Sequence, residues 1–184
     1  FDRKASKWKE IFVGIKESQL LEIVEDVTDS FGCPLPIIAL DGYEIDWPTG
    51  SIQSLSSLLG QNNWSGVFLT FDYGLNLQTL VEDRPYGTAR AYRNQKMYSE
   101  LLEYPTDQDI TCHLCWDILK AALDHSGFEH ITLQTQESFL MRHAKQNIPN
   151  IFDPNSPLRS NMLALPELIH PAHLGHGLQA PSAI

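Results

Sequence analysis

The strongest constraint on the fold is a run of five residues, Val67 to Phe71, that is apolar at every position except Thr70. An almost continuous apolar run of this length is typical of a strand that is covered on both faces of its sheet. A helix pattern precedes it at residues 49–59, and a second helix pattern begins near residue 114 and is ended by Gly127. A buried strand between amphipathic helices predicts an α/β layer structure.

The rest of the sequence predicts shorter elements. The patterns at residues 8–15 and 20–24, on either side of the turn at 16–18, predict a β-hairpin. We also expect a strand at 43–47, a strand within 128–135 and a short helix at 138–144. Residues 75–104 show no clear period, which favours a long loop that is either functional or disordered. We therefore expect a hairpin and strand region at 1–48, a core at 49–146 and an irregular tail at 147–184.

Length, charge and cysteine content exclude several classes of protein. The 184 residues suit one domain or a large piece of one, and no run of 18 apolar residues could cross a membrane. The net charge of −10, from 13 basic and 23 acidic residues, disfavours nucleic acid and favours a basic partner. Three cysteines indicate a reducing compartment rather than a disulfide scaffold. The chain opens at Phe1 without an apolar segment, so we expect no signal peptide.

The first candidate for chemistry is Asp72-Tyr73-Gly74, directly after the apolar run. Open α/β sheets bind ligands beyond the carboxyl ends of their strands, so the Asp72 carboxylate could bind a ribose hydroxyl or a cationic substrate. The alternative is a polar turn that closes the strand. Two acidic pairs, Glu44 with Asp46 and Asp107 with Asp109, could serve acid–base chemistry, but solvated charges are the default interpretation.

A metal site is a weaker candidate. Cys112 and Cys115 form a single CxxC pair, whereas a structural zinc site normally has four ligands. The other residues of ligand type are Cys33, His125, His130, His170, His173 and His176. We favour two thiols on a helix turn and a polar histidine-containing tail, and we predict no metal.

Five elements between Val67 and Ala144 occur in a characteristic order: LTFDYG, GTARAYR, QDITCHLCWDIL, SGF and TQESFL. In this order they resemble the C-terminal half of the MidA family of S-adenosylmethionine-dependent methyltransferases. Upstream, Trp8-Lys9-Glu10 with Val13, and Gly42-Tyr43-Glu44, are similar to two further segments of that family. The matching positions are Asp72, Tyr73, Gly74, Gly87, Thr88, Arg90, Tyr92, Asp109, Thr111 and His113.

The resemblance implies a fold, a reaction and a site. The fold would be the C-terminal part of a Rossmann-like class I methyltransferase sheet, with the β-hairpin as an insertion. The reaction would transfer a methyl group from S-adenosylmethionine to a protein substrate, expected to be an arginine side chain. Asp72 and Tyr73 would be the catalytic residues at the active cleft. The residues expected to contact the substrate are Asp109, Thr111, His113 and Arg90.

The resemblance leaves the cofactor site unassigned. The family's glycine-rich strand–loop–helix, and the acidic residue on its next strand, have no counterpart in this sequence. We therefore expect the chain alone to bind the cofactor weakly or not at all, and to be inactive alone. The alternative is a non-catalytic protein-interaction module derived from the same family.

The resemblance also implies partners and a location. The mitochondrial representative of the family is a protein-arginine methyltransferase that assists assembly of respiratory complex I, which points to a subunit of that complex as substrate. The compartment would be the bacterial cytoplasm or the mitochondrial matrix. A homodimer is compatible with the sequence, and neither nucleic acid nor a membrane span is expected.

Overall fold

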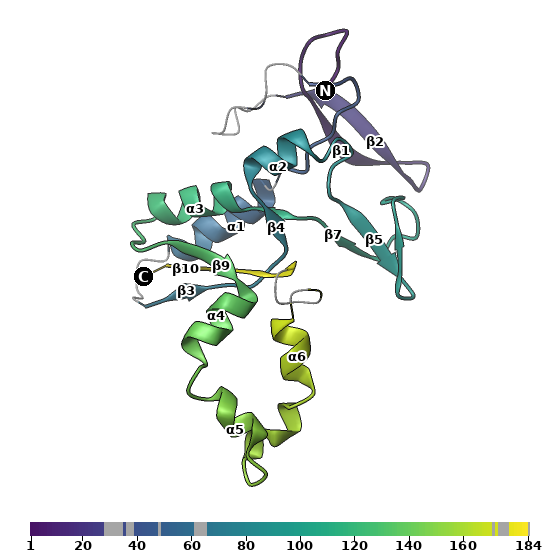
Figure 1. Ribbon diagram of the computed structural model, residues 1–184. Coiled ribbons are helices and arrows are strands. Elements are labelled where there is room, and N and C mark those ends of the chain that lie inside the picture. The colour runs from purple at the N-terminus through teal and green to yellow at the C-terminus, as the bar shows by residue number, and fades with distance from the viewer. Residues whose placement is uncertain are drawn as a thin grey trace. The chain divides into compact units, whose positions relative to one another are not determined.

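The computed structural model describes residues 1–27, 35, 39–47, 49–60, 66–170, 172 and 177–183. The chain forms two compact units, each built from two stretches of sequence. Unit 1 comprises Phe1–Ser51 and Leu75–Ile118, and unit 2 comprises Ile52–Gly74 and Leu119–Ile184. Both contain helices and strands, and the described strands form four small sheets, which confirms the expected α/β class (Figure 1). None of the helices in the described part of the chain has the length and apolar character that crossing a bilayer requires.

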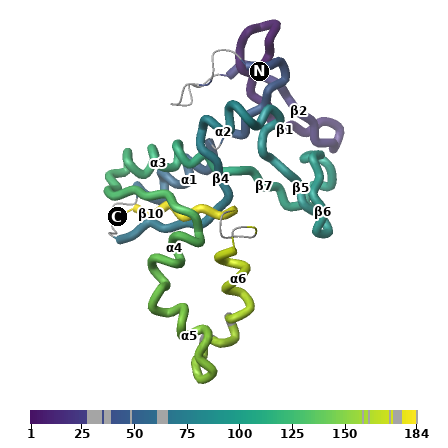
Figure 2. Tube along the Cα trace, viewed as in Figure 1, coloured from purple at the N-terminus to yellow at the C-terminus, as the bar shows by residue number. Residues whose placement is uncertain are grey.

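Short elements make up unit 1, and the tube in Figure 2 follows them along the chain. The strands are β1 (Lys9–Lys16), β2 (Gln19–Asp26), β5 (Arg90–Arg93), β6 (Lys96–Tyr98), β7 (Asp109–Thr111) and β8 (Leu114–Cys115), and the helix is α2 (Leu77–Glu82). Three further elements span the boundary between the two units in the sequence: α1 (Thr49–Leu59), β4 (Gly74–Leu75) and α3 (Trp116–His125).

The predicted hairpin is confirmed. β1 and β2 pair antiparallel from Lys9 opposite Asp26 to Lys16 opposite Gln19, and Glu17 and Ser18 form the turn with φ of 52° and 66°. Directly opposite residues of an antiparallel pair project from the same face. One face of the hairpin therefore carries Ile11, Val13 and Ile15 together with their partners Val24, Glu22 and Leu20.

Two expectations for the middle of unit 1 are wrong. Residues 75–104 are not a long loop, because they contain α2, capped by Asn76 through its side-chain oxygen, and the strands β5 and β6. These elements are too short to show a period in the sequence. Residues 43–47 form no strand beyond a single bridge between Glu44 and Tyr86.

Unit 2 is organised around a three-stranded antiparallel sheet, in which β10 (Gln179–Ala183) lies between β3 (Phe68–Leu69) and β9 (Thr132–Thr135). Leu59 of α1, Leu123 of α3 and Ala183 form its buried core. Phe68 packs against this cluster and lies edge-on to Phe128, with ring centroids 6.2 Å apart. The elements that complete the unit are α4 (Gln136–His143), α5 (Ile148–Phe152), the 3-10 helix η1 (Pro157–Asn161) and α6 (Ala164–Ile169).

The apolar run from Val67 to Phe71 is not a strand covered on both faces. Only Phe68 and Leu69 are in strand geometry, and among the described strands β3 pairs with β10 alone. Val67 is 63% exposed and Leu69 is 41% exposed, since the core covers only the side on which Phe68 lies. The apolar composition therefore reflects one buried face and an exposed edge.

The helices are close to expectation, but the last strand was not anticipated. Residues 49–59 form α1, and α3 ends before Gly127, whose φ of +83° suits the predicted helix stop. α3 begins at Trp116, slightly later than the expected start near residue 114. β10 carries the weakly apolar sequence QAPSA, and nevertheless it is the middle strand of the sheet in unit 2.

Candidate functional site

Two adjoining clefts in unit 1 are lined by several carboxylates and by aromatic side chains. The first, of about 620 Å³, is called the acidic groove here. Its carboxylates are Glu22, Glu44, Asp46, Glu100 and Glu103. The second, of about 840 Å³, is called the aromatic cavity and includes Trp8, Tyr43 and Trp47 in its lining. Because Glu22, Glu44 and Asp46 line both, the two clefts form one continuous site.

Asp46 organises the wall between the clefts. Its Oδ2 accepts hydrogen bonds from the backbone N–H of Thr88, from the Thr88 hydroxyl at 2.8 Å and from the backbone N–H of Ala89 at 2.9 Å. Thr88 is buried, and its Oγ1 accepts in turn from the backbone N–H of His113 at 3.0 Å. The Asp46 carboxylate thus joins its own segment to residues 88–89, and the Thr88 hydroxyl joins these to His113.

Gly87 is required by this arrangement. Its φ is +65°, which disfavours other residues, and a Cβ at this position would lie 2.9 Å from Asp46 Oδ2. The glycine therefore lets the backbone approach the Asp46 carboxylate closely. This gives a physical reason for the glycine of the GTARAYR segment.

The other carboxylates of the acidic groove form fewer hydrogen bonds than Asp46 does. Among the described residues, no hydrogen bond or ion pair is formed by the side chains of Glu22, Glu44 and Glu103. Glu100 accepts from the Ser99 hydroxyl at 2.8 Å, and this hydrogen bond lowers the pKa of Glu100. The groove therefore presents several carboxylate oxygens to a ligand with cationic hydrogen-bond donors.

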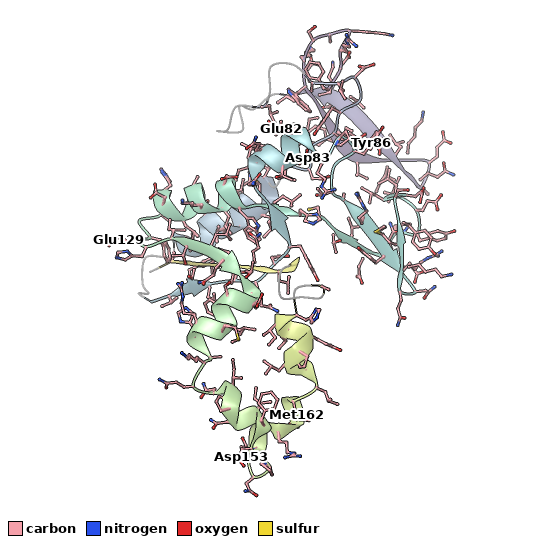
Figure 3. All side chains as sticks on the ribbon, in the orientation of Figure 1. Glu82, Asp83, Tyr86, Glu129, Asp153 and Met162 are labelled. Atoms are coloured by element: carbon pink, nitrogen blue, oxygen red, sulfur yellow. The ribbon has the colours of Figure 1, made fainter. Side chains whose placement is uncertain are left out.

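Arg90, for which substrate contact stays a prediction, lies in this groove, and its guanidinium is partly occupied. Nη1 donates to the carbonyl of Ala89 at 2.6 Å. Tyr86, labelled in Figure 3, is a further lining residue and is largely exposed. The groove thus holds five carboxylates and one arginine, so its charge balance is acidic.

The other residues expected to contact the substrate lie near Arg90, because β7 and the residues after it pair with the segment that contains Arg90. In the sheet β6-β5-β7, Arg90 lies opposite Thr111 and Tyr92 lies opposite Asp109. His113 follows β7 and reaches Thr88 through its backbone N–H. Unit 1 therefore brings Arg90, Thr111 and His113 to one region, although only Arg90 of the expected site residues lines the acidic groove.

Asp72 and Tyr73 belong to unit 2. Asp72 bridges Gln179 through two backbone hydrogen bonds of 3.2 and 2.9 Å, and its Oδ1 accepts from the backbone N–H of Tyr73 at 2.7 Å. The Asp72 side chain is half-buried, and Tyr73 is exposed. Asp72 therefore sits in a tight turn beside β10, and the role of both residues stays a prediction.

The cysteine and histidine candidates gain no support as a metal site. Cys115 is buried at the end of β8, whereas Cys112 is exposed and lines the aromatic cavity, so the pair does not lie on a helix turn. Within the described ranges, no three side chains of His, Cys, Asp or Glu are grouped as a metal would require. Cys33, His173 and His176 lie outside the described residues.

Solved structures with the same fold come from Burkholderia thailandensis. One is a native crystal structure of an uncharacterized protein, with a TM-score of 0.80 and 18% sequence identity over 97% of this chain. A second, of the same superfamily, is described as a "likely methyl transferase" bound to S-adenosyl-homocysteine, with a TM-score of 0.79 and 18% identity over 96% of this chain. These matches cover 49% and 47% of the solved chains, so this chain spans about half their length.

A sequence-family model gives the classification. No curated protein matches the sequence. Residues 1–133 match the family model described as "Putative S-adenosyl-L-methionine-dependent methyltransferase". The match covers well over half of the chain and includes both clefts of unit 1 and the Asp72 turn. The chain therefore belongs to this family of S-adenosyl-L-methionine-dependent methyltransferases.

Proposed function

We propose that this protein takes part in methyl transfer from S-adenosylmethionine to an arginine side chain of a protein, and that unit 1 holds the arginine. The observation that carries this proposal is the acidic groove, in which the carboxylates of Glu22, Glu44 and Glu103 make no interaction within the described ranges. A guanidinium presents five N–H donors in a planar fork that matches carboxylates in pairs. The groove therefore suits an arginine better than a neutral acceptor.

The residues of the groove would act by positioning. Carboxylates on either side of a guanidinium fix its plane and direct one nitrogen, and such orientation is a large part of catalysis in a group transfer. Asp46 would act indirectly, because its hydrogen bonds to Thr88 and Ala89 hold the strand end from which Arg90 projects. Asp109 and Thr111 would support the same strand through the pairing of β7 with β5.

The described residues do not fit the cofactor as a whole. Gln179 Oε1 is a buried acceptor without a hydrogen-bond donor in the described part of the chain, and its residue bridges Asp72. An acceptor of this kind suits an ammonium or a ribose hydroxyl, both of which the cofactor has. The sequence holds no G-x-G-x-x-G run, however, so no close backbone approach for the rest of the cofactor is evident. When bound, the cofactor would supply an electrophilic methyl group.

The test uses the protein as its gene encodes it. It is incubated with S-adenosylmethionine carrying a labelled methyl group and with arginine-containing peptides, and the labelled residue is identified by mass spectrometry. We expect label on arginine. Asp72→Ala should abolish it with an unchanged circular dichroism spectrum, and Glu44→Gln should raise KM and lower kcat, because Glu44 would help to orient the guanidinium. Glu25→Gln, on the opposite face of the hairpin and outside both clefts, is the matched control.

The contrary results are specific. Unchanged activity in Asp72→Ala would remove Asp72 from the site. Bound cofactor without label on arginine would remove the proposed acceptor. Peptide binding without cofactor binding would favour the alternative, a non-catalytic interaction module.

A further inference from the structure

The aromatic cavity is a binding surface that arginine recognition alone does not use. Its volume of about 840 Å³ lies in the range of about 300–1,000 Å³ that is typical of ligand pockets. Trp8, Tyr43 and Trp47 contribute aromatic rings to its lining. A guanidinium held by the carboxylates of the acidic groove would leave this apolar volume unfilled.

The hairpin supplies an exposed apolar wall to this cavity. Ile11 lies opposite Val24 and Val13 opposite Glu22, all on one face, and all four residues line the cavity. Val13 is 59% exposed and Val24 is 60% exposed. Exposed apolar side chains that line a concave surface are typical of interaction sites, whereas scattered ones are not.

Charge specifies what can occupy the cavity. Glu22, Glu44 and Asp46 line the cavity and the acidic groove alike, so an apolar group in the cavity has carboxylates beside it. Lys9 is a basic residue of the lining, and its ammonium is paired with Asp26. A ligand that is complementary to this surface combines an apolar group with a neighbouring cation.

We propose that the aromatic cavity binds a bulky apolar side chain that lies close to the arginine in the sequence of the substrate polypeptide. This rests on the proposed function and adds a sequence preference to it: the substrate segment carries a residue such as phenylalanine or leucine close to its arginine. Glu22, opposite Val13 on the hairpin, lies at the junction where the two side chains diverge.

The experiment measures binding of a fluorescein-labelled nonapeptide containing Arg-Gly-Phe by fluorescence anisotropy, without cofactor. Two control peptides replace Phe by Ser, or Arg by citrulline, which is neutral and has nearly the same shape. We expect each replacement to weaken binding at least tenfold. Because no cofactor is present, this result is independent of the methyl-transfer assay. Selective peptide binding here, together with no methylation in that assay, would support the role of the aromatic cavity and contradict the proposed methyl transfer.

Matched variants of the hairpin assign the effect to the cavity. Val13→Ser should weaken binding of the Phe peptide several-fold and leave the Ser peptide unchanged. Ile15→Ser is the control, because Ile15 lies on the same strand and face, is 78% exposed and does not line the cavity. Glu22→Gln should weaken only peptides that contain arginine, and Glu25→Gln should weaken none.

Three outcomes would overturn the proposal. One is equal binding of the Phe and Ser peptides. Another is an equal effect of Val13→Ser and Ile15→Ser. The third is a dimer in analytical ultracentrifugation that Val13→Ser dissociates, because a second copy of the chain would then be the occupant.

Discussion

At the scale of single residues, Asp46 is the side chain on which the local structure most depends. Asp46→Ala would leave the backbone N–H groups of Thr88 and Ala89 without their acceptor, in a wall where Thr88 is buried. Unsatisfied buried donors of this kind cost about 1–3 kcal/mol each. We expect urea denaturation to show a loss of about 2–3 kcal/mol in the free energy of unfolding.

A neighbouring carboxylate provides the control for this prediction. Glu103 also lines the acidic groove, but its side chain makes no hydrogen bond within the described ranges. Glu103→Ala should therefore change the free energy of unfolding by no more than about 0.5 kcal/mol. Equal losses in the two variants would show that the hydrogen bonds of Asp46 are not what stabilises this wall.

A second residue-scale prediction concerns acid. The ammonium groups of Lys7, at 2.6 Å, and Lys9 lower the pKa of Asp26 to about 2 from its ordinary value of 3.8. Because the pKa of Asp26 is lower in the folded state, its ionised form stabilises the folded protein at pH values above the unfolded-state pKa of about 3.8. This stabilisation is lost as the pH falls from about 3.8 to about 2. NMR titration of the Asp26 carboxyl carbon should give the low pKa, and Lys7→Met should raise it.

Residue chemistry was only partly visible in the sequence. The order of motifs led to Arg90, Thr111 and His113, which the structure brings to one region. Glu44 and Asp46 were visible as an acidic pair, but solvated charges explained them equally well. Asp46 accepts hydrogen bonds from Thr88 and Ala89, which lie 42 and 43 positions later in the sequence. No local spacing in the sequence encodes such a contact.

At the scale of elements, α4 depends on its first hydrogen bond. Thr135 Oγ1 accepts from the backbone N–H of Ser138 at 3.2 Å and so caps the helix. Thr135→Ala should lower the free energy of unfolding by about 1 kcal/mol, whereas Thr135→Ser keeps the hydroxyl and should have little effect. Thermal denaturation of the unchanged protein and the two variants measures these differences. A Thr135→Ser variant as unstable as Thr135→Ala would show that loss of the capping hydrogen bond does not explain the destabilisation.

Elements were predictable where a local pattern was long enough. The eight-residue strands of the hairpin and the helices α1 and α3 follow their patterns closely. The strands β3 and β10 show the opposite case. The apolar residues around β3 suggested burial on both faces, although the strand lies at an edge, and QAPSA gave no strand signal for β10. Pairing partners, rather than composition, decide such positions.

At the scale of the whole molecule, the net charge of −10 should act on association with a basic substrate. Raising the salt concentration from about 0.1 M to about 1 M shortens the Debye length from about 10 Å to about 3 Å. We expect the association rate constant of the Arg-Gly-Phe peptide to fall about tenfold or more over this range. Stopped-flow anisotropy measures it, and a similar fall for the citrulline peptide would contradict an electrostatic origin.

The position of β10 between β3 and β9 has a consequence for synthesis on the ribosome. β3 emerges well before β10, its only partner among the described strands. The exposed side chains of Val67 and Leu69 must therefore wait, with an unpaired backbone edge, until β10 has been synthesised. The nascent chain would need a chaperone, or rapid translation of the segment between β3 and β10, to protect that edge from premature association.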